Sequence, residues 1–266
     1  VLSGQLFAFH MSLFLLLFVF IFTKLYYWLN LKTLPINFIL RTFIISFFIR
    51  IFFVGVFYFI LEYFIGIPFL TLKDDYQYYL SSMAIVEQWS LNGVSLVDNV
   101  MFSTGFYSGY PYMSSLLIHI FNGDTIITPR IGNAFFSALT VILAYKLTRL
   151  YSTERESRLV AVIFMFSPLF ITYASLQLKD TVLLFLVSVI IYFLSKILLN
   201  KINIVGISLL ILCSGLIILF RAAALIPIYG GFILIISYIT FNKTNFLNNW
   251  RNYFYVILAL GGFYLI

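Results

Sequence analysis

Hydrophobic residues occupy most of the chain in long, uninterrupted runs. These runs reach about 20 residues, the length of a membrane-spanning helix, and they recur along the whole sequence. Because a lipid-exposed backbone has to satisfy its own hydrogen bonds, the runs predict α-helices. We expect an all-α, polytopic membrane protein with about seven or eight transmembrane helices, near residues 5–27, 43–66, 130–150, 159–177, 181–199, 203–220, 222–241 and 252–266, the last of them short.

Polar residues concentrate in one stretch between the second and third predicted spans. Apolar side chains recur there at helical spacing from Tyr76 to Val86, which predicts an amphipathic helix in the membrane interface that ends at Asn92-Gly93. A second short helix is expected near residues 112–121. The predicted organisation is a single membrane domain, 1–266, with two spans in 5–66, an extracytoplasmic loop with interfacial helices in 67–129, and the remaining spans in 130–266.

Composition and charge support a membrane protein and indicate its orientation. Only 9% of the residues are charged and 63% are hydrophobic, whereas a soluble domain has about 25% charged residues. The net charge of +7 comes from basic residues in short loops, such as Arg41 before the second span and Lys146 to Arg158 between the third and fourth. This distribution predicts topology and no nucleic-acid partner: the basic loops are cytoplasmic, and the 67–129 loop faces the other side. Trp89 in that loop suits the headgroup level.

An acidic pair, Asp74 and Asp75, follows directly on the second predicted span. The chain has only nine acidic residues, and an acid at a membrane is costly to keep without a role. A partly desolvated carboxylate can act as a general base toward a hydroxyl group. In the structural alternative, Asp74 only caps the interfacial helix.

Further charged residues lie at span ends on the same predicted side. Arg130 begins the third span, Lys179 and Asp180 form the turn before the fifth, and Arg221 follows the sixth. Arginine and lysine there can hold a phosphate group, so a base facing them suits transfer from a lipid phosphate. The structural alternatives are an ion pair of Arg130 with Asp124, a capping role for Asp180, and an Arg221 that reaches the interface.

Other polar residues point to packing. Arg50 and Glu62, within the second span, are expected to be internal partners or interface residues, and His119 a packed or interfacial residue. Adjacent acids point in different directions, so Asp74 and Asp75 do not predict a metal site by themselves. We expect no cofactor; a divalent metal is compatible with these acids and is not assumed.

The order of these features resembles the GT-C superfamily of membrane glycosyltransferases, over roughly residues 40–230. The closest likeness is to the bacterial branch related to protein O-mannosyltransferases and the aminoarabinose transferase of lipid A. The matching features are Asp74-Asp75 with Tyr78, the helix to Gly93, Tyr110-Pro111, Phe121-Asn122-Gly123 and Arg130. The later Ser167-Pro168, Lys179-Asp180 and Arg221 are similar to features of polysaccharide-associated members.

The resemblance implies inverting transfer of a sugar from a polyprenyl-phosphate donor to a hydroxyl of a lipid, glycan or protein, outside a bacterial plasma membrane. Asp74 then matches the catalytic acid and Asp75 its neighbour; Arg130, Lys179 and Arg221 would contact the donor phosphate, and Tyr78 and Asp180 the substrate. Most members are longer, so the chain is interpreted as such a transferase or as its N-terminal catalytic portion. A transporter or flippase of a lipid-linked saccharide and a non-catalytic scaffold subunit are the alternative classes.

Overall fold

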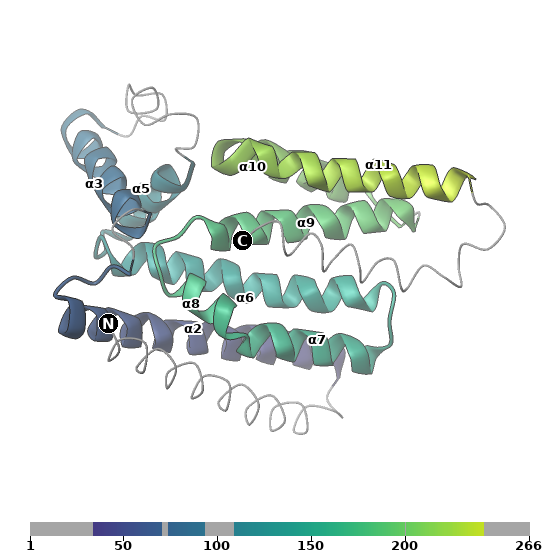
Figure 1. Ribbon diagram of the computed structural model, residues 1–266, viewed down its shortest axis with the longest axis horizontal. Coiled ribbons are helices and arrows are strands. Elements are labelled where there is room, and N and C mark those ends of the chain that lie inside the picture. Colours follow the sequence, from purple (N-terminus) through teal and green to yellow (C-terminus); the bar gives the residue numbers. More distant parts are fainter. Residues whose placement is uncertain (1–33, 71–73, 94–108, 200, 242–266) are drawn as a thin grey trace, which may run out of the picture. The chain divides into compact units, whose positions relative to one another are not determined.

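The computed structural model describes residues 34–70, 74–93, 109–199 and 201–241 (Figure 1). These ranges contain helices and no strand, which confirms the predicted all-α class. The helices are α2 (Pro35–Ile65), α3 (Asp75–Asn92), α5 (Gly109–Phe121), α6 (Ile127–Arg149), α7 (Glu154–Phe166), α8 (Pro168–Ala174), α9 (Asp180–Leu198), α10 (Ile204–Arg221) and α11 (Leu225–Phe241), with a 3-10 turn at Ala222–Ala224. The predicted spans 5–27 and 252–266 lie outside the described residues.

Four stretches of the described residues are long and apolar enough to cross a membrane: α2, α6, α9 and Ile204–Ile235. The bent pair of α7 and α8 makes a fifth if it is one span. The stretch Ile204–Ile235 reverses direction, because the hydroxyl groups of Ser214 and Tyr229 are hydrogen-bonded to each other. A straight helix would separate these two residues by about 22 Å. Helices α10 and α11 are therefore a hairpin, in agreement with two predicted spans.

The chain divides into two compact units. Unit 1 comprises Val1–Leu96 and Pro111–Phe185, and unit 2 comprises Val97–Tyr110 and Leu186–Ile266. Unit 2 contains the α10–α11 hairpin and most of α9. Its α10 begins at the cap residue Asn203, whose side chain accepts a hydrogen bond from the Gly206 amide at 3.0 Å. Gly206 also lets α10 approach α9, since a Cβ atom there would lie 2.9 Å from the Phe193 ring.

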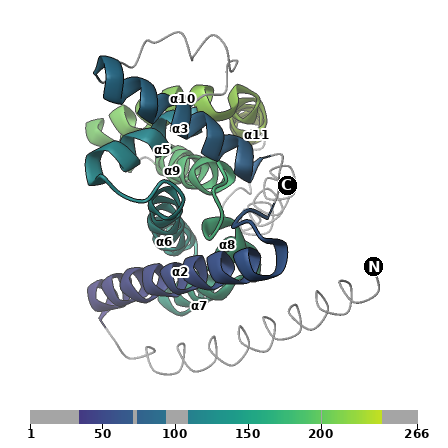
Figure 2. The ribbon, with the colours of Figure 1, turned by 90° about the vertical axis from the view of Figure 1, so that its left-hand side faces the viewer.

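Unit 1 is built around α6, against which α2 and α7 pack (Figures 1 and 2). Its core includes Phe38 of α2, Tyr145 of α6 and Met165 of α7, all buried. At 23 residues, α6 is about 34 Å long, enough to cross the hydrocarbon layer. We call its two extremities the Asp75 end, at the start of α6, and the Glu154 end, where α6 turns into α7.

The predicted span 159–177 is a broken helix. Helix α7 ends at Phe166, α8 begins at Pro168, and the two are bent by 51°. Proline has no amide hydrogen, so Pro168 leaves the carbonyl of Phe164, four residues earlier, without its helical donor. Hydropathy alone predicts one continuous span here, because the proline changes the hydrogen bonding and not the apolar character.

Arg50 of α2 compensates this break. Its fully buried guanidinium donates to the carbonyl oxygens of Phe164 and Met165, both at 3.4 Å. It also donates to the Ser137 hydroxyl at 2.6 Å and to the Ser46 carbonyl at 3.0 Å. The carbonyl end of a helix carries a partial negative charge, so α7 stabilises this cation within the bundle. Arg50 is thus an internal partner, as the sequence predicted.

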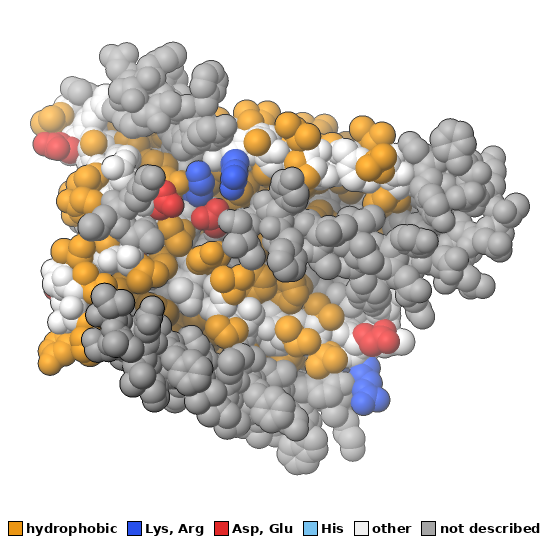
Figure 3. Space-filling view, in the orientation of Figure 1, with side chains coloured by type: hydrophobic (Ala, Val, Ile, Leu, Met, Phe, Trp, Pro, Cys, Tyr) orange, Lys and Arg blue, Asp and Glu red, His pale blue; other side chains and the backbone are white. Residues whose placement is uncertain are grey.

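Helix α2 begins at Pro35, eight residues before the predicted start, because proline is tolerated in a first helical turn. Arg41, expected in a loop, therefore lies on α2 with its side chain exposed. Phe48, Phe52 and Phe59 of α2 are also exposed, by 63%, 66% and 71%. Over the described residues in Figure 3, hydrophobic side chains dominate and charged ones are few. Such a surface suits contact with lipid.

Candidate active site

Helices α3 and α5 pack against each other after α2. The Ser115 hydroxyl of α5 donates to the Ser82 carbonyl of α3 at 2.9 Å. Trp89 of α3 is only 2% exposed and lies against the rings of Tyr112 and His119. Aromatic residues of α5 therefore cover Trp89, and its expected position at the headgroup level stays a prediction. This packing sets the direction of α3, whose first residue is Asp75.

Asp75 is fully buried and joins three distant segments of unit 1. Its Oδ2 atom lies 3.6 Å from the guanidinium of Arg130, which is also fully buried. The backbone amide of Leu70 donates to Oδ2 at 3.3 Å, and that of Gln177 donates to Oδ1 at 2.9 Å. Arg130 also donates to the Pro68 carbonyl. The acid therefore links the loop after α2 and the segment before α9 to the start of α6.

Burial dominates the titration of Asp75. Loss of water raises the pKa of its carboxyl group, while the charge of Arg130 and the amides of Gln177 and Leu70 lower it; the net shift is upward. Arg130 and both amides stabilise the ionised form, and the complete burial of the carboxyl group outweighs them. An isolated acid in this position would be still harder to ionise.

Asp74 has a different environment although it is the adjacent residue. It occupies the N-cap position of α3, its side chain is exposed, and it makes no capping hydrogen bond. The structural alternative for Asp74, a side-chain cap, is therefore not what this geometry shows. The structure thus separates the pair into one buried, fully engaged carboxylate and one accessible carboxylate.

Tyr78 and Lys179 meet one turn into α3. The Lys179 ammonium lies 5.8 Å from the centroid of the Tyr78 ring, and both side chains are half-buried. The Tyr78 amide donates to the Asp74 carbonyl at 2.9 Å, so these two residues are separated by one helical turn. The structure therefore brings three predicted site residues, Asp74, Tyr78 and Lys179, to the first turn of α3, beside the Asp75–Arg130 pair.

The segment before Lys179 is held from two sides. Asn133 of α6 donates its side-chain amide to the carbonyl oxygens of Leu176 at 2.8 Å and Leu178 at 3.0 Å. Between them, Gln177 donates its backbone amide to Asp75. Neither Asn133 nor Gln177 was predicted from the sequence as a site residue. The available signal was the presence of uncharged amides in otherwise apolar stretches, where a polar group needs a partner.

The remaining predicted residues have other surroundings. Asp180 is the first residue of α9 and, with Arg50, Tyr173 and Thr181, lines a small internal cavity of unit 1.

Asp124 caps the start of α6 by accepting hydrogen bonds from the amides of Ile126 and Ile127 at 2.8 and 2.7 Å, while Arg130 pairs with Asp75. Arg221 ends α10 in unit 2, with an exposed side chain.

No group of three or more His, Cys, Asp or Glu side chains that could bind a metal occurs in the part of the chain the structure describes. Asp74 and Asp75 have different burial, which agrees with the expectation that the two adjacent acids do not form a clamp. Metal dependence stays a prediction.

The apolar helices and the charged end of unit 1 define an integral membrane protein with a polar site at one extremity of its helical bundle. The chain belongs to the dolichyl-phosphate-mannose-protein mannosyltransferase family, whose family model matches residues 109–266, more than half of the sequence. Membership implies a membrane glycosyltransferase that uses a lipid-linked sugar donor. No curated protein matches the chain, and no solved structure matches it.

The family match covers only part of the candidate site. It contains Arg130, Lys179, Asp180 and Arg221, but it begins after Asp74, Asp75 and Tyr78. The family therefore confirms the predicted enzyme class in its broad form. The roles of the individual residues depend on geometry.

Proposed function

We propose that this chain transfers a sugar from a polyprenyl-phosphate donor to an acceptor hydroxyl on the extracytoplasmic side of a bacterial plasma membrane, with inversion. The observation that supports this most is the contrast within the acidic pair. A buried ion pair between Asp75 and Arg130 fixes the start of α3, and it leaves Asp74 exposed beside Tyr78 and Lys179.

Asp74 is the proposed general base. Its carboxylate is exposed and makes no capping bond, so a substrate hydroxyl can reach it. The acceptor oxygen attacks the anomeric carbon, the bond from that carbon to the phosphate oxygen breaks, and the hydroxyl proton passes to Asp74. Asp75 acts as a positioning residue, because both of its oxygens are engaged by Arg130 and backbone amides and none of its surface is exposed.

Lys179 is the proposed contact of the donor phosphate, and a phosphate contact by Arg221, which lies in unit 2, stays a prediction. Negative charge grows on that phosphate as the sugar leaves, and a cation next to it stabilises the transition state. Lys179 lies against Tyr78, the proposed substrate-binding residue one turn after Asp74. Arg130 was expected to share this role; its burial against Asp75 and the Pro68 carbonyl favours positioning, and a phosphate contact by Arg130 stays a prediction. The same holds for substrate binding by Asp180.

Substitution of the two acids tests this division of roles. Asp74→Asn should lower kcat for sugar transfer by about 100-fold or more, the usual contribution of a general base, with little change in the unfolding temperature. Asp75→Asn should lower both stability and activity, because one backbone amide loses its acceptor. Glu87→Gln, at an exposed acid of the same helix, is the matched control and should leave both unchanged. Full turnover by Asp74→Asn would overturn the proposed base.

A transporter or flippase of a lipid-linked saccharide is the second candidate, favoured by the broken α7–α8 span and by the buried charge of Arg50. Carbonyl and hydroxyl groups already occupy the guanidinium, so this charge has a structural explanation. Reconstituted vesicles with a labelled donor distinguish the classes. Glycosylated acceptor supports the transferase, movement of the intact donor between leaflets supports the transporter, and neither supports the scaffold subunit.

A further inference from the structure

The buried side chain of Gln177 stands out for its hydrogen bonding among the residues that the structure describes. It is fully buried, and neither the oxygen nor the nitrogen of its side-chain amide has a partner in the described part of the chain. Burying an unpaired amide costs about 1–3 kcal/mol. A residue kept under such a penalty needs an explanation.

Stability does not provide that explanation. The neighbours Leu176 and Leu178 are buried and belong to an apolar cluster with Leu61. A methionine or leucine at position 177 would be similar in size and would bury no unpaired polar group. The hydrogen bond from Gln177 to Asp75 comes from the backbone amide, and any residue except proline provides that amide.

The position of Gln177 relates it directly to the proposed site. Its backbone amide is 2.9 Å from Asp75 Oδ1, and Asn133 holds the carbonyl groups on either side of it. Lys179, the proposed phosphate contact, follows two residues later and lies against Tyr78. Three contacts from α3 and α6 therefore fix the backbone of Gln177 between the acidic pair and the proposed phosphate contact.

We propose that the side-chain amide of Gln177 binds a hydroxyl group of the sugar carried by the lipid-linked donor. This inference rests on the proposed function and adds a specificity-determining residue to it. An amide offers one donor and one acceptor group, which matches the two hydrogen-bonding capacities of a sugar hydroxyl. Because the amide is fully buried, the lipid-linked sugar can reach it only if the side chains that cover it move. The hydrogen bonds that the amide then gains offset part of the free-energy cost of that movement.

Binding measurements with two ligands test the inference. The probes are dolichyl-phosphate-mannose and dolichyl phosphate without the sugar, in the same detergent–lipid mixture. Gln177→Met should weaken binding of the sugar-bearing lipid about threefold to tenfold, the value of one neutral hydrogen bond, and leave the affinity for dolichyl phosphate unchanged. Its unfolding temperature should stay the same or rise, because the unpaired amide is gone. Gln177→Leu provides the same comparison if the methionine variant fails to fold.

Ser114→Ala is the matched control. Ser114 of α5 is also fully buried, with an unpaired hydroxyl among the described residues, and it has no place in the proposed site. This variant should retain full preference for the sugar-bearing lipid. An unchanged preference in Gln177→Met would overturn the role of Gln177 while the proposed function stands. Equal binding of both lipids by the wild-type chain would overturn the role and leave the phosphate contacts intact. Binding of neither lipid would overturn the proposed function as well.

Discussion

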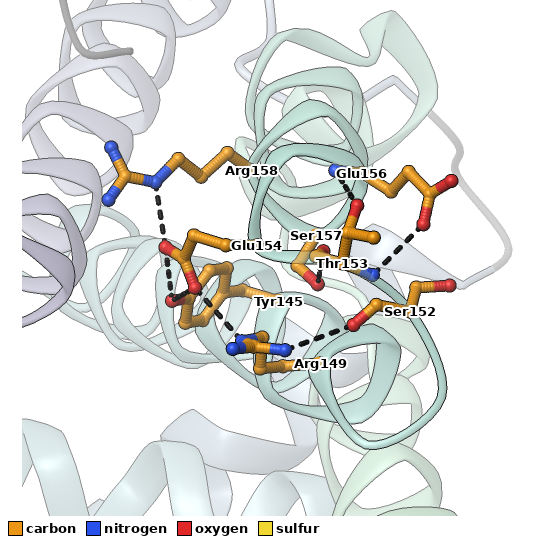
Figure 4. A network of polar contacts seen from close by, with 8 residues as sticks. All are labelled: Tyr145, Arg149, Ser152, Thr153, Glu154, Glu156, Ser157 and Arg158. Carbon is orange, nitrogen blue, oxygen red and sulfur yellow. Dashed lines mark hydrogen bonds and ion pairs between the residues drawn. The ribbon is translucent and has the colours of Figure 1, made fainter. Parts of the chain in front are cut away.

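The two ends of unit 1 each hold an acid between basic or polar partners, but they are built from different parts of the chain. At the Glu154 end, the Glu154 carboxylate accepts hydrogen bonds from the Tyr145 hydroxyl at 2.8 Å and from Arg158 at 2.7 Å (Figure 4). It also forms an ion pair with Arg149 at 3.0 Å. These residues lie within 14 positions of one another, and the Glu154 side chain is 30% exposed. At the Asp75 end, the acid is fully buried, and its partners come from residues 70, 130 and 177.

The difference in burial and in sequence separation between the two ends indicates that they have different roles. The Glu154 network stabilises the turn between the consecutive helices α6 and α7. This structural role is enough to explain the polar residues that form it. A fully buried ion pair loses more hydration energy, and replacing both partners with apolar residues is often neutral or stabilising. The Asp75–Arg130 pair is therefore poorly explained by stability alone. Its place beside the exposed Asp74 supports the view that it is kept to position the start of α3.

Removal of Arg130 should produce the largest effect on stability. Arg130→Met leaves the Asp75 carboxylate buried without its cation, and such a change costs about 3–5 kcal/mol of unfolding free energy. Denaturant unfolding in detergent measures the loss. The same substitution at Arg149, whose side chain is 51% exposed, should cost far less. Equal losses at the two positions would contradict the comparison.

The pH dependence of the Arg130→Met variant should be the next largest effect. Burial raises the pKa of Asp75, and loss of Arg130 removes one of the causes that lower it, so the folded pKa rises further above the unfolded value. A group with a raised folded pKa stabilises the protein below the unfolded pKa, and this stability is lost as pH rises through the folded pKa. The variant should thus be less destabilised at pH 5 than at pH 8.

The double variant Asp75→Asn/Arg130→Met provides the control for that titration. It has no carboxyl group at position 75, so the extra pH dependence should disappear. The expected slope in the single variant is about 1.4 kcal/mol per pH unit between the two pKa values. A similar slope in both variants would assign the titration to another group.

The sequence predicted most helical elements of unit 1 from their apolar or amphipathic patterns, but it missed the start of α2 and the break between α7 and α8. It could not predict the division between Asp74 and Asp75. Both are acids at the start of one helix, and only the partners of Asp75, which lie 55 and 102 positions away at Arg130 and Gln177, decide which of the two is buried.

Sequence patterns also failed at Pro168 and Gln177, for a related reason. A proline in an apolar run is compatible with a kink or a break, and Arg50, more than 110 positions earlier, supplies the donors that make the break stable. Gln177 looks like an ordinary loop residue until its complete burial is known. The role of a polar side chain inside a membrane bundle therefore depends on its partners on other helices.

A third prediction concerns the local character of the Glu154 end. Thr153 and Glu156 form a capping box at the start of α7: the Thr153 amide donates to the Glu156 side chain at 3.0 Å, and the Thr153 hydroxyl accepts from the Glu156 amide at 3.4 Å (Figure 4). Thr153→Ala should cost about 1 kcal/mol of unfolding free energy, with sugar transfer unchanged. Thr153→Ser, which keeps the hydroxyl, is the control. A loss of transfer in the alanine variant at full stability would show that this end takes part in function.

The smallest effect is expected at Arg149, and its salt dependence separates the two ends most directly. Arg149→Ala removes an ion pair with Glu154 and a hydrogen bond to the Ser152 carbonyl, but Arg158 and Tyr145 continue to hold the acid. The loss should lie between about 0 and 1 kcal/mol in dilute buffer and vanish near 1 M salt, where the screening length falls to about 3 Å. The loss in Arg130→Met should persist at the same salt concentration, because ions do not reach a fully buried pair. If salt removed both losses alike, water would have access to Asp75, and Asp75 would become as good a candidate for the general base as Asp74.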